Sequence, residues 1–104
     1  MKKLLGGMEF ETDEEGFIKE TEKWNETVAE DLAKGESAYP MNGDHWKVVN
    51  FIRSYFLKYG IAPPVRMVCK QTGFGQKYIY QLFPSGPANG ACKVAGLPKP
   101  TGCV

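Results

Sequence analysis

Glycine and proline residues divide this sequence into short amphipathic segments, and this punctuation limits what the chain can fold into. Gly35, Gly60 and Gly73 each follow a stretch with helical spacing of apolar residues, so each is expected to end a helix. Pro63 and Pro64 favour the start of a further helix, because proline is tolerated in a first turn. The helices expected on this basis cover residues 24–34, 45–59, 63–72 and 76–83, with Asp44 as the N-cap of the second.

An N-terminal β-hairpin is expected before these helices. Residues 8–12 alternate apolar or β-branched with acidic side chains, residues 13–16 have turn composition, and Phe17 and Ile18 return the chain. The two short helices within residues 63–83 resemble a helix-turn-helix. The predicted fold is therefore mainly α: a small helical bundle with a helix-turn-helix-like part, an N-terminal β-hairpin and a C-terminal flexible arm.

The arm is expected to begin at Pro84, where the composition changes. Glycine and proline dominate residues 84–90 and 96–102, which disfavours helices and central strands there. The chain is thus predicted to comprise a hairpin-plus-helix domain, 1–83, and an arm, 84–104. A flexible arm of this length would carry its last residues roughly 22–26 Å from Pro84, far enough to enter the active-site channel of a larger partner.

Charge is distributed very unevenly along the chain. All 12 Asp and Glu residues lie within residues 1–44, whereas residues 45–104 contain 8 of the 13 Lys and Arg residues and no acidic side chain. The two halves can attract each other within one fold. Alternatively, the basic half can receive an anion, an acidic protein surface or nucleic acid.

Several classes of protein are disfavoured by the composition. Apolar runs are far shorter than the roughly 20 residues of a membrane span, and the N-terminal apolar stretch ends before acidic residues, unlike a signal peptide. A cytoplasmic location is expected, where three cysteines do not form a structural disulfide framework. With His45 as the only histidine and no Cys-x-x-Cys, no metal site and no cofactor are expected.

Two of the three cysteines, Cys92 and Cys103, lie in the predicted arm. Cys103 is the penultimate residue, where a thiol can reach away from the body or fold back toward Cys92. The cation of Lys93 is expected to favour the Cys92 thiolate, making Cys92 the residue that attacks and resolves sulfur carried on Cys103. The terminal carboxylate disfavours the Cys103 thiolate unless it is neutralised, for which the basic half offers Arg66, Lys70 and Lys77. Cys69 follows an apolar pattern and is expected to be structural.

The C-terminal sequence resembles that of the DsrC family, the small partner proteins of dissimilatory sulfite reductase. The resemblance is carried by residues 82–87, 90–93 and 95–104, with support from residues 60–66 and 72–74, and runs from about residue 8 to the end. It implies that sulfur is delivered onto Cys103 and that Cys92 closes a trisulfide, which a membrane-bound thiol/disulfide redox complex then processes. Sulfur-oxidising relatives instead receive sulfur from relay proteins, and TusE-like proteins of tRNA thiolation keep only the penultimate cysteine.

On this basis the chain is expected to be a sulfur-transfer co-substrate of sulfite reductase and not an enzyme by itself. A sulfur relay protein of the tRNA-thiolation type is an alternative, which the presence of Cys92 disfavours. One alternative is a nucleic-acid-binding regulator that uses the helix-turn-helix at 63–83, with base contacts from side chains of the second helix. Another is a general thiol oxidoreductase. That class places its reactive cysteines at a helix N-terminus, whereas this sequence predicts an irregular arm around them.

Overall fold

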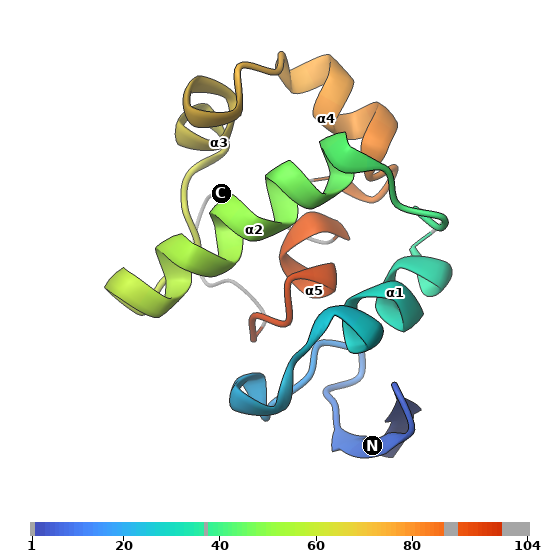
Figure 1. Ribbon diagram of the computed structural model, residues 1–104. Coiled ribbons are helices and arrows are strands. Elements are labelled where there is room, and N and C mark those ends of the chain that lie inside the picture. The colour runs from blue at the N-terminus through green and yellow to red at the C-terminus, as the bar shows by residue number, and fades with distance from the viewer. Residues whose placement is uncertain (1, 37, 87–89, 99–104) are drawn as a thin grey trace.

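The longest helix, α2 (Gly43–Tyr59), runs through the middle of the molecule, and the other helices pack around it. The structure is a computed structural model that describes residues 2–36, 38–86 and 90–98. In Figure 1, α3 and α4 lie on one side of α2, and α1 and α5 lie on the other. The remaining helices are η1 (Thr21–Lys23), α1 (Glu26–Gly35), α3 (Val65–Thr72), α4 (Gln76–Leu82) and α5 (Cys92–Val94). None of the helices in the described ranges has the length and apolar character needed to cross a bilayer.

The ends of the helices follow from local capping chemistry. The Asn42 side chain accepts hydrogen bonds from the backbone N–H groups of Asp44 and His45, and the His45 ring accepts one from the Asn42 N–H. This reciprocal pair makes Asn42 the N-cap of α2, so the prediction of Asp44 as cap was wrong by two residues. Gly60 ends the helix as predicted, in the left-handed conformation that glycine adopts without steric cost (φ 76°).

The N-terminal hairpin is present and contains the predicted strand at residues 8–12, but the partner of this strand precedes it and does not follow it. Strand β1 (Lys2–Leu5) pairs antiparallel with β2 (Met8–Glu11). Gly6 and Gly7 connect them with φ values of 57° and 81°, the positive values that a two-residue hairpin turn requires. The predicted return of residues 17–18 is reduced to a single bridge between Thr12 and Ile18.

Helices α3 and α4 form the helix-turn-helix-like part of the predicted fold. Gly73 ends α3 in the left-handed conformation and Gly75 precedes α4, so the turn spans three residues. Val68 and Ile79 are buried against the core. Four side chains of α4 that could reach a partner are exposed: Gln76, Lys77, Tyr80 and Gln81.

Residues 90–98 are part of the hydrophobic core, which corrects the prediction that they belong to a flexible arm. Ala91, Cys92, Val94, Ala95 and Leu97 are at most 1% exposed. They pack with α1 and α2, so the apolar residues of this segment bury apolar surface of these two helices. The reach estimated from Pro84 therefore does not apply, since the chain is held at Leu97. Residues 99–104, including Cys103, lie outside the described residues.

Candidate functional site

Cys92 begins α5 and its thiol is enclosed by the core. The residue is 1% exposed, and its carbonyl accepts a hydrogen bond from the Leu97 N–H at 3.1 Å, which closes the turn that follows α5. Burial raises the pKa of the Cys92 thiol to about 12, because a thiolate is poorly solvated in an apolar environment. At neutral pH the thiol is therefore protonated and is shielded from solvent reagents.

Two side chains from distant parts of the chain hold the turn after Cys92. The Trp24 indole N–H donates to the Val94 carbonyl at 2.8 Å, and the Arg53 guanidinium donates to the Ala95 carbonyl at 3.1 Å. Arg53 also lies over the Trp24 ring, 4.6 Å from its centroid, and burial lowers its pKa. This Trp24–Arg53 clamp fixes the path of the backbone as it leaves Cys92.

The Lys93 ammonium does not act on Cys92 as predicted. Its Nζ atom donates to Glu36 Oε2 at 2.9 Å and lies 5.0 Å from the centroid of the Phe17 ring. Both charged side chains are mostly buried, at 14% and 11% exposure. The cation is thus neutralised by its own partner, and the raised pKa of Cys92 shows that burial dominates. The expectation that Lys93 activates Cys92 is wrong.

The other three proposed cations lie on the far side of α2. Arg66 and Lys70 are exposed on α3, and Lys77 is exposed in the first turn of α4. Cys103 and the terminal carboxylate lie outside the described residues, so neutralisation of that carboxylate by these cations stays a prediction. Cys69 is half-buried and packs against the core, and its structural role stays a prediction. Within residues 2–36, 38–86 and 90–98, no cluster of three His, Cys, Asp or Glu side chains could hold a metal ion.

Comparison with known proteins identifies the family to which this arrangement belongs. The family model described as "DsrC like protein" matches residues 5–104, almost the whole sequence and both cysteines of the C-terminal segment. The chain belongs to the DsrC family. The resemblance inferred from the C-terminal sequence is therefore confirmed, and it extends slightly further toward the N-terminus.

Relatives of this chain include proteins named as sulfite reductase gamma subunits and proteins named as sulfurtransferases. The dissimilatory-type sulfite reductase subunit gamma of Nitratidesulfovibrio vulgaris is 49% identical over 98 residues, covering 94% of this chain and 93% of its own length. The sulfurtransferase TusE of Escherichia coli is 42% identical over 108 residues, with coverage of 97% and 98%. The crystal structure of the oxidized gamma-subunit (DsrC) from Archaeoglobus fulgidus aligns over the full length of both chains, with 46% identity and a TM-score of 0.87.

The residues that fix Cys92 were not predicted from the sequence of this DsrC family member. One signal for Arg53 was available: it lies four residues after Val49 and three before Phe56, so helical spacing puts a cation on an apolar face. Such a cation has to find buried acceptors, here the carbonyls of Ala95 and Thr21. No local pattern marks Trp24, Glu36 or Gly96, whose partners lie far away in the sequence.

The burial of Cys92 predicts a strong difference in thiol reactivity. In reduced, folded protein at pH 8, iodoacetamide should modify Cys92 about a hundredfold or more slowly than the half-buried Cys69, because only the thiolate reacts and it must be exposed. The Cys92 rate should keep rising as the pH passes 9, since its thiol loses its proton only toward pH 12. Peptide mapping by mass spectrometry measures both rates. Guanidinium should abolish the difference; equal rates in folded protein would refute the burial argument.

Proposed function

We propose that this chain is a sulfur carrier and a co-substrate of dissimilatory sulfite reductase. In this proposal Cys103 receives the sulfur and Cys92 closes a trisulfide or disulfide with it. The observation that carries the proposal is the family match over residues 5–104, together with 49% identity to a protein named as the gamma subunit of that reductase. Thiol chemistry at two cysteines does not require a cofactor of the chain's own, so the chain acts as a substrate of its partner and not as an enzyme by itself.

The environment of Cys92 supports a division of labour between the two thiols. A buried, protonated thiol reacts poorly with small thiols and disulfides in solvent. It is therefore reserved for a sulfur that the chain itself brings to it, and that sulfur would be the one on Cys103. The Trp24–Arg53 clamp holds Cys92 in place for that encounter.

The proposed bridge balances in atoms and electrons. Reducing the S(IV) of sulfite to a zero-valent sulfur between the two cysteines takes four electrons. Oxidation of the Cys92 and Cys103 thiols supplies two of them, and the electron donor of the reductase supplies the other two. With protons from solvent, the three sulfite oxygens leave as water and one trisulfide forms. A membrane-bound thiol/disulfide redox complex would then reduce the trisulfide, releasing sulfide and restoring both thiols.

Intact mass with cysteine mapping tests the proposal. Reduced protein is incubated with sulfite reductase, sulfite and a limiting reductant, and the remaining thiols are then alkylated in guanidinium, so that burial does not protect Cys92. We expect the gain of one sulfur atom, with Cys92 and Cys103 both blocked and Cys69 free. If no sulfur is gained and all three thiols are alkylated, the chain is not a co-substrate of the reductase.

A sulfur relay of the kind used in tRNA thiolation is the second candidate. It is favoured by the 42% identity to sulfurtransferase TusE over 97% of this chain. A relay needs only a persulfide on Cys103, passed on to the next thiol in the chain of carriers. The same mapping separates the two: in a relay Cys92 would remain open to alkylation in unfolded protein after Cys103 has been loaded.

A further inference from the structure

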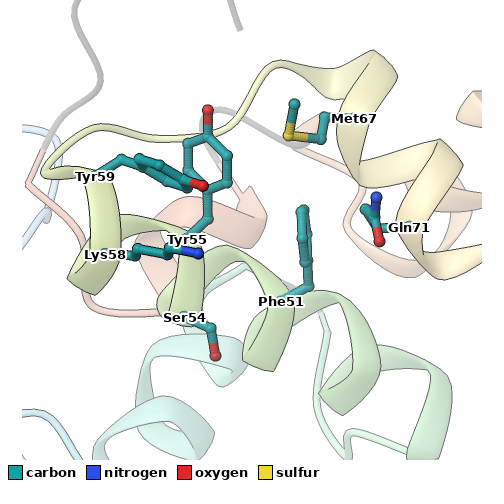
Figure 2. Close-up of a pocket in the computed structure, with 7 residues that line it drawn as sticks. All are labelled: Phe51, Ser54, Tyr55, Lys58, Tyr59, Met67 and Gln71. Carbon is teal, nitrogen blue, oxygen red and sulfur yellow. The ribbon is translucent and has the colours of Figure 1, made fainter.

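A groove between α2 and α3 is left open on the side of α2 that faces away from Cys92. It encloses about 650 Å³, with Phe51, Tyr55 and Met67 among the residues that line it. Figure 2 shows Met67 and Gln71 of α3 facing Phe51 and Tyr55 of α2 across this space. A neighbouring recess of about 520 Å³ shares Met67 and Gln71 with it. Volumes in this range accommodate a ligand or several inserted side chains.

The lining of the α2–α3 groove combines apolar and aromatic side chains with polar ones, and several of the apolar ones are exposed. Tyr59, which lines the groove near the end of α2, is 56% exposed. Met67, at the centre of the two hollows, is 36% exposed. Aromatic residues and methionine gathered in one exposed place are typical of protein interfaces, where methionine adapts to different partners.

The rim of the groove carries positive charge without compensation. Lys58 lines the groove, and Arg66 and Lys70 line the adjoining recess, with no Asp or Glu in either lining. Ion pairs in the described part of the chain use other lysines, such as Lys23 and Lys93. Because residues 45–104 contain no Asp or Glu, no side chain of this half can neutralise the rim.

We propose that the α2–α3 groove binds an acidic, amphipathic segment of the protein with which this chain exchanges sulfur. Carboxylates of the segment would pair with Lys58, Arg66 and Lys70, and an aromatic or aliphatic side chain would enter between Phe51 and Met67. Nucleic acid fits this surface less well, since the exposed Met67 side chain would gain nothing from a phosphate backbone. A second copy could offer its acidic half, but that head-to-tail contact would leave further surfaces open and extend into chains.

This proposal rests on the proposed function for its choice of partner. The binding test therefore uses dissimilatory sulfite reductase from which its own gamma subunit has been removed. We expect the double variant Lys58→Glu/Arg66→Glu to weaken binding about tenfold or more at low salt. The matched control is Lys3→Glu/Lys19→Glu, which makes the same change in net charge at exposed lysines outside the groove. It should change the dissociation constant by less than about twofold. Equal weakening in both variants, or in neither, would overturn the proposal.

Crosslinking locates the contact independently of affinity. A photoreactive phenylalanine analogue at position 67 should crosslink to an acidic segment of the reductase. The same group at Leu4, which is 70% exposed on β1, should not. Two outcomes would overturn the proposal if the groove variant still binds the reductase. Loss of binding to duplex DNA would assign the groove to nucleic acid. Loss of self-association in sedimentation would assign it to a second copy of this chain.

Sulfur loading separates this proposal from the function on which it rests. If wild-type protein never gains sulfur but the groove variant binds the reductase more weakly than its control, the docking surface stands and the co-substrate role fails. If wild type loads and the groove variant binds and loads equally well at limiting reductase, the docking surface fails alone. If the variant loads only when the reductase is raised to saturating concentration, both proposals are supported.

Discussion

Replacing Cys103 with alanine is expected to abolish sulfur loading, reducing the gain of one sulfur atom to background. The reason is that Cys92, the other cysteine of the C-terminal segment, is 1% exposed and keeps its proton until about pH 12. It cannot substitute for Cys103 as the acceptor of sulfur from a partner's active site. The measurement is intact mass after incubation with sulfite reductase, sulfite and limiting reductant. Normal loading of the Cys103→Ala variant would contradict the central role of that residue.

Two further cysteine variants serve as controls for that experiment. Cys92→Ala should still accept sulfur on Cys103 but should not form the intramolecular bridge, so its added sulfur would be released by a mild thiol reductant. Cys69→Ser should load and bridge like wild type, because Cys69 lies on α3 and packs against the core. Its expected effect is a loss of stability of about 1–2 kcal/mol from placing a hydroxyl in a partly apolar site. A large loss of loading in folded Cys69→Ser would assign Cys69 to the sulfur chemistry.

The helices of this chain could be predicted because their signals are local. Glycine at 60 and 73 ends α2 and α3 in the left-handed conformation, and apolar spacing selected the faces buried through Val48, Ile52 and Ile79. The observed hairpin lies closer to the N-terminus than the predicted one, and the reason is equally local. Gly6 and Gly7 form a better two-residue turn than residues 13–16, because both adopt the positive φ values that such a turn requires.

The burial of residues 90–98 could not be predicted in the same way, because it depends on contacts across the whole chain. Glycine and proline on both sides of this segment suggested an arm, yet Val94 and Ala95 are completely buried against the rest of the core. The charge of Lys93 was misinterpreted for the same reason, since its partner, Glu36, precedes it by 57 residues. The cysteines could be chosen as candidates from the sequence, but the raised pKa of Cys92 follows only from tertiary packing.

Gly96→Ala is expected to destabilise the protein by about 2–4 kcal/mol. Gly96 has a φ of 77°, where a side chain costs about 1–2 kcal/mol. In addition, a Cβ atom would lie 2.2 Å from Trp24 Cδ1 and 3.0 Å from an Arg53 guanidinium nitrogen, so the Trp24–Arg53 clamp would have to move. Moving it weakens the hydrogen bonds to the Val94 and Ala95 carbonyls. Thermal unfolding should show a decrease in Tm of roughly 10–20 °C for a domain of this size.

Gly60→Ala is the matched control, because Gly60 has nearly the same φ, 76°, and a Cβ atom there meets nothing within 4 Å. It should show only the backbone cost, about 1–2 kcal/mol. The two variants also differ in a second readout. Alkylation of Cys92 should accelerate in Gly96→Ala, because the turn that covers it is displaced, and should be unchanged in Gly60→Ala. If the two variants lose equal stability and keep Cys92 equally protected, the clamp does not hold the Cys92 segment in place. If Cys92 becomes reactive only in Gly96→Ala, the clamp keeps this thiol closed to solvent.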